Sequence, residues 1–248
     1  MNDQKIKIFS IPNFITLINL LCGCLSIVFA FNNLLIPAAL LIFAAGIFDF
    51  LDGFAARLLK TYSDIGKQLD SLADVVSFGV APSVIVFKLL EWTVLTKYND
   101  VQLQNPLFTI ALPGLAFILA LFSALRLAKF NIDSRQSDSF IGVPTPAAAF
   151  LVASFPFIVR DYPNFQHIIL NEYVLLIVVI VLSVLLISEI PLISLKFKNF
   201  NPVNNKSRYL LLTTSIVLLI LFHISAFPII FILYLIISVI DPLIQQKR

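Results

Sequence analysis

The chain has 248 residues, of which 59% are hydrophobic and only 12% are charged, and its formal net charge is +3. Because soluble domains carry about 25% charged residues, this composition excludes an ordinary soluble protein. Several apolar runs reach the roughly 20 residues that a helix needs to cross a bilayer, and no series of short alternating segments indicates a barrel. We therefore expect an all-α polytopic membrane protein.

Apolar segments follow one another along the whole chain and predict about eight transmembrane helices. They cover residues 11–31, 34–56, 68–90, 107–127, 143–160, 172–194, 208–223 and 225–241. The loops between them are short and polar, so no separate soluble domain is expected. The sequence therefore predicts a single integral membrane domain over residues 1–248.

The basic residues predict the orientation of these helices. If the N-terminus is cytoplasmic, 14 of the 17 Lys and Arg residues fall at cytoplasmic helix ends or loops. Only Lys97 and Arg160 fall in outer loops, and Lys88 lies near the outer end of the third span. Cytoplasmic loops of membrane proteins carry an excess of Lys and Arg. We therefore expect both termini to be cytoplasmic.

Four aspartates interrupt the apolar sequence where the second predicted helix ends and the third begins. Asp49 and Asp52 are three residues apart, and Asp70 and Asp74 are four apart, so each pair shares a helix face. An antiparallel helical hairpin brings both pairs to the same depth, just within the cytoplasmic leaflet. Close carboxylates repel one another and either take up protons or bind a cation. Because divalent cations such as Mg²⁺ bind carboxylate oxygens, we predict a site for two divalent metals held by all four aspartates.

Small and basic residues accompany these aspartates. Gly53, Ala56 and Gly66 leave room for a close ligand or backbone, and Arg57 can bind a phosphate through its bidentate fork. Carboxylates, metals and an arginine at a membrane surface favour phosphoryl-group chemistry, in which one carboxylate takes a proton from the attacking hydroxyl. Asp64, in the turn between the pairs, is expected to be a cap or a solvated residue.

The same positions match the signature of the CDP-alcohol phosphotransferase family, D-x2-D-G-x2-A-R-x8-G-x3-D-x3-D. The fixed positions are filled by Asp49, Asp52, Gly53, Ala56, Arg57, Gly66, Asp70 and Asp74. This resemblance implies that an alcohol attacks a CDP-linked substrate and displaces CMP, and that the aspartates hold two divalent ions, Mg²⁺ or Mn²⁺. It implies that Asp74 is the general base and that the glycines, the alanine and the arginine of the signature line the CDP site.

Three further segments, 10–27, 67–82 and 124–149, resemble the phosphatidylserine synthases of bacteria and archaea. The second reads L-D-S-L-A-D-x-V-S-F-G, and the third reads R-x2-K-F-N followed by G-x-P-x-P. Lys129 stands where that subfamily usually has a second arginine, which keeps the charge but loses the bidentate fork. The resemblance covers most of residues 10–150, where we expect the catalytic helices, and leaves additional spans at about 170–241.

This second resemblance implies the donor, the acceptor and the setting. The donor is CDP-diacylglycerol, the acceptor is L-serine, and the enzyme is a homodimer in the cell (inner) membrane whose active site faces the cytoplasm. The partners are then the two substrates and the lipid bilayer, and no nucleic acid is expected.

Residues outside the signature are candidates for the rest of the site. A small zwitterionic acceptor needs a cation for its carboxylate and an acidic or carbonyl partner for its amine. Arg126, Lys129 and Asn131 lie at the cytoplasmic end of the fourth span, level with the aspartates, and are candidates to bind serine or phosphate; they also fit a role in topology alone. Asn13 and Thr16, near the start of the first span, are candidates to face the metal or the nucleotide, although Asn13 fits a helix cap equally well.

Two alternatives stay open at this stage. The same fold with glycerol 3-phosphate or inositol phosphate as the acceptor would need an additional basic pocket for the second phosphate, and an archaeal ether lipid is another donor. A divalent-cation transporter also places carboxylates in the membrane. All four aspartates lie on one side, however, and no carboxylates continue the path through the midplane, which argues against a transporter.

Overall fold

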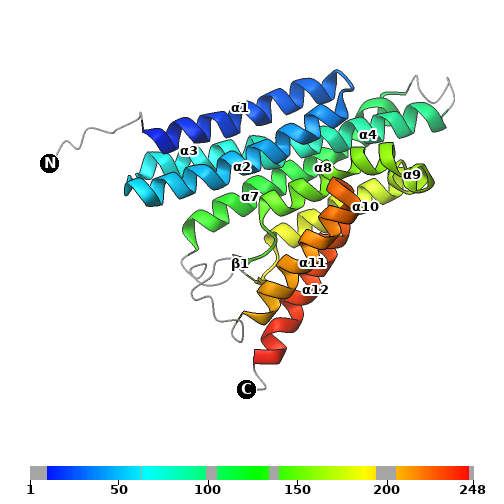
Figure 1. Ribbon diagram of the computed structural model, residues 1–248. Helices are drawn as coiled ribbons and strands as arrows, with labels where there is room; N and C mark the ends of the chain where they lie inside the picture. Colours follow the sequence, from blue (N-terminus) through cyan, green and yellow to red (C-terminus); the bar gives the residue numbers. More distant parts are fainter. Residues whose placement is uncertain (1–9, 62, 99–104, 134–139, 194–204, 246–248) are drawn as a thin grey trace.

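The computed structural model describes residues 10–61, 63–98, 105–133, 140–193 and 205–245. Within these ranges the chain is helical apart from short connections and two strands of two residues each, which confirms the predicted all-α polytopic fold (Figure 1). The elements of the first half are α1 (Ile11–Phe31), α2 (Leu35–Leu59), α3 (Asp64–Asp74), η1 (Val75–Val80), α4 (Ala81–Lys97), η2 (Leu107–Ala111), α6 (Leu112–Gly114), η3 (Leu115–Phe117) and α7 (Ile118–Ile132). Those of the second half are β1 (Phe140–Ile141), α8 (Thr145–Asp161), α9 (Pro163–Ile169), α10 (Glu172–Ile187), β2 (Pro191–Leu192), α11 (Lys206–Phe222), η4 (His223–Ala226) and α12 (Phe227–Gln245).

Each of the eight predicted segments corresponds to a helical stretch, but not each is long enough to count as a span. Five helical stretches in the described part of the chain are long and apolar enough to cross a membrane, and a sixth is added if α9 and α10, bent by 67°, form one span. The number falls below eight because α8 has 17 residues and because α11 and α12, which η4 joins without a gap, are counted together as the 36 residues Lys206–Asp241. The cytoplasmic orientation stays a prediction, and the basic residues within 1–9, 134–139, 194–204 and 246–248 that led to it lie outside the described residues.

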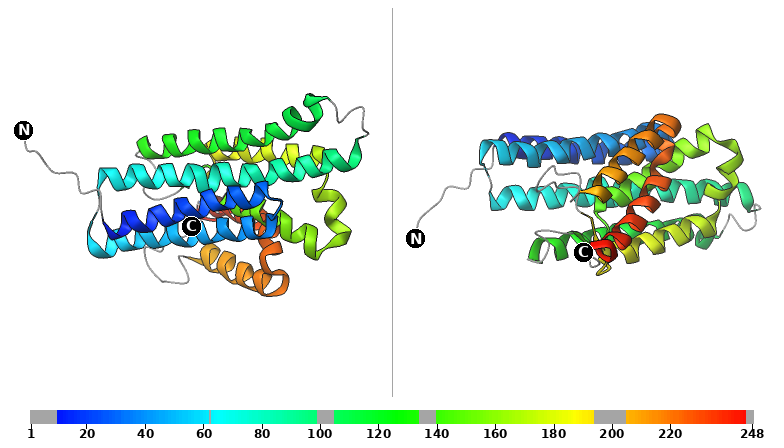
Figure 2. Two further views of the ribbon diagram at one scale, coloured as in Figure 1. Left: turned by 90° about the horizontal axis from the view of Figure 1, so that it is seen from above. Right: turned by 60° about the horizontal axis from the view of Figure 1, so that its bottom comes forward.

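The helices form an antiparallel bundle with an attached hairpin. Helices α1 and α2 run side by side in opposite directions, and α1 also packs on α3, η1 and α4 (Figures 1 and 2). Helices α11 and α12 form the hairpin, which turns at η4 and packs mainly against α8. The chain reverses at His223, where φ is +50°.

Helix α1 shows how the sequence divides between lipid and protein. The face turned to the other helices carries buried polar or small residues, namely Asn13, Thr16, Asn19, Gly23 and Ser26. The opposite face is exposed and apolar, with Phe14, Leu17, Leu21, Leu25 and Val28. Buried polar groups in a membrane need partners inside the protein. Ser26 finds one by donating a hydrogen bond to the carbonyl oxygen of Ala38 at 2.8 Å.

The connection between α2 and α3 is shorter than the sequence predicts. Most of the segment 55–68 is helical, because α2 continues to Leu59 and α3 begins at Asp64. Lys60 ends α2 in the left-handed conformation at φ +51°, and the Ser63 side chain caps α3 by accepting a hydrogen bond from the Gly66 amide at 3.1 Å. Asp64 is therefore an exposed first-turn residue rather than the cap.

Helix α10 also ends earlier than predicted, at Ile187 instead of residue 194. Ser188 takes an extended conformation, and Pro191 cannot supply the amide that a helix needs. The chain instead forms β2, which pairs antiparallel with β1 and aligns Ile141 with Pro191. Gly142 follows at φ +76°, and a Cβ there would lie 2.6 Å from the carbonyl oxygen of Leu186, so glycine is required at this turn.

Candidate active site

Three of the predicted aspartates meet between α2 and α3. Each of Asp49, Asp70 and Asp74 offers one carboxylate oxygen, and these oxygens all lie within 4.8 Å of one another. Asp74 is buried, and the other two are half-buried. The one-turn spacing of Asp70 and Asp74 on α3 points both toward Asp49 of α2, as the sequence predicts for a shared helix face.

Asp52 lies outside this group of three and is bound by α1. The Thr16 hydroxyl donates a hydrogen bond to Asp52 Oδ2 at 2.6 Å, and the same hydroxyl lies 3.0 Å from the carbonyl oxygen of Pro12. Both Thr16 and Asp52 are buried. The structure thus places Thr16 at the site, in contact with an aspartate.

Asn13 lies at the same end of α1, and it is not the cap of that helix. Ser10 is the cap and accepts a hydrogen bond from the Asn13 amide at 3.3 Å. A Cβ on Gly66 would lie 3.0 Å from Asn13 Oδ1, so Gly66 allows α3 to approach this side chain. The structure therefore brings two predicted CDP-site residues, Asn13 and Gly66, together.

Asn19 is a site residue that the sequence reasoning missed. Its amide donates a hydrogen bond to Asp74 Oδ1 at 3.3 Å, and its backbone carbonyl accepts one from the Ser77 hydroxyl at 3.0 Å. The available signal was its spacing, because Asn19 follows Thr16 by three residues on a helix that is otherwise apolar.

The helix after Asp74 departs from α geometry where α1 comes closest. Residues Val75–Val80 form the π-helical segment η1, and such segments occur frequently at functional sites. A Cβ on Gly23 would lie 2.5 Å from Ser77 Oγ and 2.8 Å from Ser77 Cα. Only glycine therefore permits this contact between α1 and η1, which holds Asn19 beside Asp74.

The remaining residues of the signature border open space. Among the described residues, no atom lies within 4 Å of a Cβ built on Gly53, so packing does not explain its missing side chain. Ala56 is half-buried, and Arg57 is exposed one turn beyond Gly53, with no partner in the part of the chain that the structure describes. An unobstructed helix face that ends in a guanidinium suits a phosphate-bearing ligand.

Arg126 of α7 is a buried cation within electrostatic reach of Asp74. Its side chain is 6% exposed, and its Nη1 donates a hydrogen bond to the Thr145 hydroxyl at 3.2 Å. The guanidinium carbon lies 4.8 Å from the centre of the Phe130 ring, and Asp74 is near enough to attract its charge. A buried cation is thus held in one orientation by Thr145 and Phe130.

The other two predicted acceptor residues have protein partners. Lys129 forms an ion pair with Glu189, which lies just after α10. The Asn131 side-chain amide donates a hydrogen bond to the Ser71 hydroxyl at 2.7 Å, and the Asn131 backbone carbonyl accepts one from the Lys67 ammonium at 3.0 Å. Asn131 therefore joins α7 to α3 next to Asp70.

The donor set fits a divalent metal. The group formed by Asp49, Asp70 and Asp74 contains only carboxylate oxygens, which hard divalent ions prefer. Asp70 Oδ1 is buried, and the described residues supply it with no hydrogen-bond donor. A buried anionic oxygen without a donor needs a cation, because leaving it unpaired is costly.

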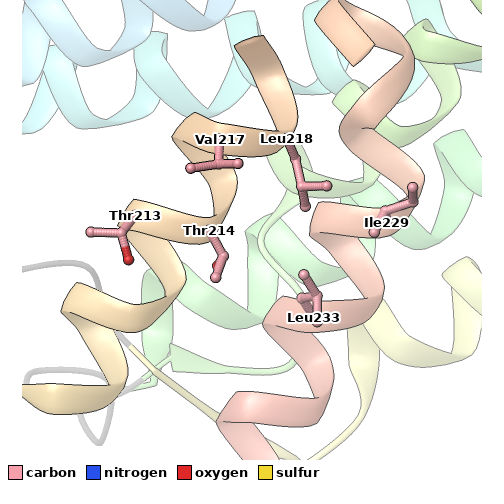
Figure 3. Close-up of a pocket in the computed structure, with 6 residues that line it drawn as sticks. All are labelled: Thr213, Thr214, Val217, Leu218, Ile229 and Leu233. Atoms are coloured by element: carbon pink, nitrogen blue, oxygen red, sulfur yellow. The ribbon is translucent and has the colours of Figure 1, made fainter. Parts of the chain in front are cut away.

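A pocket of about 360 Å³ between α11 and α12 is separate from these residues (Figure 3). It is lined by Thr213, Thr214, Val217, Leu218, Ile229 and Leu233. Both threonine hydroxyls hydrogen-bond to carbonyl oxygens of their own helix, at 2.8 Å and 2.7 Å. The pocket therefore presents a mainly apolar wall.

Comparisons with known proteins agree with this geometry. The family model described as CDP-alcohol phosphatidyltransferase matches residues 9–185. The chain is 33% identical to a CDP-diacylglycerol–serine O-phosphatidyltransferase of Helicobacter pylori over 236 residues, which cover 94% of this chain and 91% of the relative. It is 35% identical to the enzyme of that name from Methanocaldococcus jannaschii over 184 residues, 74% of each chain. It is also 35% identical to an archaetidylserine synthase of Methanothermobacter thermautotrophicus over 158 residues, 62% of this chain and 61% of the relative.

The family match covers more than half of the chain, and it spans all four aspartates, Arg57 and Arg126. The relatives add similarity along nearly the whole sequence. The chain is thus a transferase and belongs to the CDP-alcohol phosphatidyltransferase family.

Proposed function

We propose that this enzyme transfers the phosphatidyl group of CDP-diacylglycerol to L-serine, giving phosphatidylserine and CMP. The observation that carries the proposal is the meeting of Asp49, Asp70 and Asp74 beside the buried cation Arg126. The choice of serine is supported by the activity for which the Helicobacter pylori and Methanocaldococcus jannaschii relatives are named.

Asp49, Asp70 and Asp74, together with Asp52, would hold two divalent ions, Mg²⁺ or Mn²⁺. When bound, such ions polarise phosphate oxygens and offset the negative charge that develops on them. Thr16 would fix the Asp52 carboxylate through its 2.6 Å hydrogen bond to Oδ2, which would leave the other carboxylate oxygen for a metal ion.

Asp74 is the proposed general base. Its Oδ1 is held by the Asn19 amide at 3.3 Å, which sets the orientation of the carboxylate. The carboxylate takes the proton of the serine hydroxyl, and the serine oxygen then forms a bond to the phosphorus that carries diacylglycerol. The bond from that phosphorus to the CMP oxygen breaks, and CMP leaves with the electron pair.

The CDP part of the donor would lie against α2, α3 and the start of α1. The residues proposed to line this site are Asn13, Thr16, Gly53, Ala56, Arg57 and Gly66. Gly53 leaves open space, and Arg57 supplies an exposed guanidinium for the diphosphate. The diacylglycerol part would remain among the lipids.

Arg126 is the proposed anion contact for the phosphate or for the serine carboxylate. Its hydrogen bond to Thr145 and its contact with Phe130 hold the guanidinium in place before a ligand arrives. Lys129 and Asn131 are proposed to complete this region from the same helix end.

The setting is proposed on the same grounds. We expect one integral membrane domain over residues 1–248 with the catalytic helices at about 10–150, active as a homodimer in the cell (inner) membrane. The distribution of Lys and Arg supports an active site that faces the cytoplasm.

The acceptor is tested directly with purified enzyme in detergent, CDP-diacylglycerol and Mn²⁺ or Mg²⁺. Radiolabelled serine, glycerol 3-phosphate and inositol phosphate are compared as acceptors, and CMP release and labelled lipid are measured. We expect labelled lipid from serine and at most background from the two phosphorylated alcohols. CMP release that requires an acceptor other than serine would refute the substrate assignment.

Thr16→Val is expected to lower the turnover rate by roughly tenfold or more, because a hydrogen bond to a charged group contributes about 1.5–3 kcal/mol. The change removes the donor to Asp52 but keeps the size of the side chain. Thr214→Val is the matched control, since the Thr214 hydroxyl bonds only within α11. Equal activity of the two variants would show that the contact between Thr16 and Asp52 has no role in the reaction.

A further inference from the structure

An exposed ion pair stands next to Arg126 at the end of the bundle that holds the aspartates. Lys129 follows Arg126 by three residues on α7, which is about 4.5 Å along the helix axis. The Lys129 ammonium pairs with Glu189 and also lies 3.4 Å from the carbonyl oxygen of Ile187. Two cations and one carboxylate are therefore grouped at this end of α7.

The segment that carries Glu189 is fixed on both of its sides. Before the strand, the Gly142 amide donates to the carbonyl oxygen of Ile190 at 2.9 Å. After it, Ile193 accepts a hydrogen bond from the Tyr234 hydroxyl at 3.3 Å and donates one to Ser238 Oγ at 3.2 Å. Glu189 is thus presented on a segment held by β1 and α12, and preorganised groups bind ligands at a lower entropic cost.

The pair is accessible to a small ligand from solution. The side chains of Lys129 and Glu189 are 34% and 59% exposed. The ion pair between Lys97 and Glu172 differs, since the Glu172 side chain is only 3% exposed and joins α4 to α10. Exposed ion pairs contribute little to stability, so a charged ligand can replace one partner at low cost.

We propose that Glu189 binds the ammonium group of the acceptor amino acid, exchanging its partner Lys129 for the ligand, while Arg126 and Lys129 bind the carboxylate. This inference rests on the proposed function, in which the acceptor is L-serine. An amino acid carries an ammonium group and a carboxylate on the same carbon, and the ion pair offers the two opposite charges in one small region. An alcohol with a phosphate and no amine would leave Glu189 without its ligand and facing a like charge.

Glu189 lies outside residues 9–185, the part of the chain that matches the family model. The aspartates, Arg57 and Arg126 all lie inside it. Selection of the acceptor at Glu189 can therefore change without altering the residues that bind the CDP part of the donor.

The test compares Glu189→Gln with the unaltered enzyme in detergent, with CDP-diacylglycerol and Mn²⁺. The KM for L-serine is expected to rise about tenfold, with kcat and the KM for CDP-diacylglycerol within about twofold, because a charged hydrogen bond to the amine is weakened. The second acceptor is 3-hydroxypropanoate, which lacks the amine and is measured as a substrate or as a competitive inhibitor. The KM or inhibition constant of 3-hydroxypropanoate should not change. The preference for serine over 3-hydroxypropanoate should therefore fall by the same tenfold factor, about as much as the KM for serine rises.

Asp161→Asn is the matched control, because it removes a carboxylate from the exposed pair with Arg160 at the other end of α8. A second variant exchanges the charges, Lys129→Glu with Glu189→Lys. If the pair is only structural, the exchange restores the KM for serine, and that outcome would overturn the proposal. An unchanged KM in Glu189→Gln, or an equal change for serine and 3-hydroxypropanoate, would overturn it as well. If the unaltered enzyme makes no labelled lipid from serine, the proposed function itself fails.

Discussion

Asp74→Asn is expected to abolish measurable turnover, with a loss of at least about a hundredfold, while CDP-diacylglycerol still binds. The amide cannot accept the proton of the acceptor hydroxyl, and general-base catalysis contributes roughly a hundredfold to ten-thousandfold. The Asn19 amide can still donate to the remaining side-chain oxygen, so the position of the side chain should be kept. CMP release measures the turnover, and equilibrium binding of radiolabelled CDP-diacylglycerol measures the donor site.

Asp64→Asn provides the control, because Asp64 is exposed in the first turn of the same helix. This variant should retain the activity and the donor affinity of the unaltered enzyme. Turnover that survives in Asp74→Asn would remove Asp74 from the role of base. Loss of donor binding together with turnover would instead show that Asp74 acts mainly by holding the metal site.

The second large effect is expected from Gly23→Ala. A Cβ at this position would meet Ser77 Cα at 2.8 Å, which is backbone and cannot move aside alone. Helix α1 would have to separate from η1, and the Asn19 side chain would move away from Asp74. We expect a melting temperature lowered by about 2–8 °C, as a loss of about 1–2 kcal/mol predicts for a chain of this size, and turnover reduced at least about tenfold.

Gly53→Ala separates packing from helix propensity in this experiment. Alanine favours a helix over glycine by about 1 kcal/mol, and the described residues leave the space beside Gly53 open. Gly53→Ala should therefore keep or slightly raise the melting temperature while it raises the KM for CDP-diacylglycerol. A Gly23→Ala variant as stable as Gly53→Ala would contradict the close approach of α1 and η1.

The sequence could predict the aspartate site because helical spacing is a local property. Residues four apart on α3 share a face whatever the rest of the fold does, and Asp70 and Asp74 do lie together with Asp49. The separate position of Asp52 depends on Thr16, which is 36 residues away in the chain. Contacts of that kind depend on how α1 packs against α2, and helical periodicity does not describe packing.

The helix ends show the same limit. The predicted connection from α2 to α3 is too long. Hydrophobicity marks the membrane-crossing part of a helix and does not mark its capped ends, which lie at Lys60 and Ser63. The early end of α10 depends on Pro191 and on pairing with a strand 50 residues earlier. The pairing of Glu189 with Lys129 joins residues 60 apart, and local sequence patterns do not predict such a contact.

The length of the third helical stretch has a consequence for where the chemistry takes place. Residues Asp64–Lys97 form 34 helical residues, which extend for about 51 Å. The hydrocarbon layer is about 30 Å thick, and even a tilt of 40° shortens the stretch only to about 39 Å. Some of it must lie beyond the hydrocarbon, and the charged residues of α3 make that end the one best suited to the headgroup region. A lipid that never leaves its leaflet and an acceptor that never enters the membrane can then meet at the aspartates, so the reaction needs no passage for either substrate.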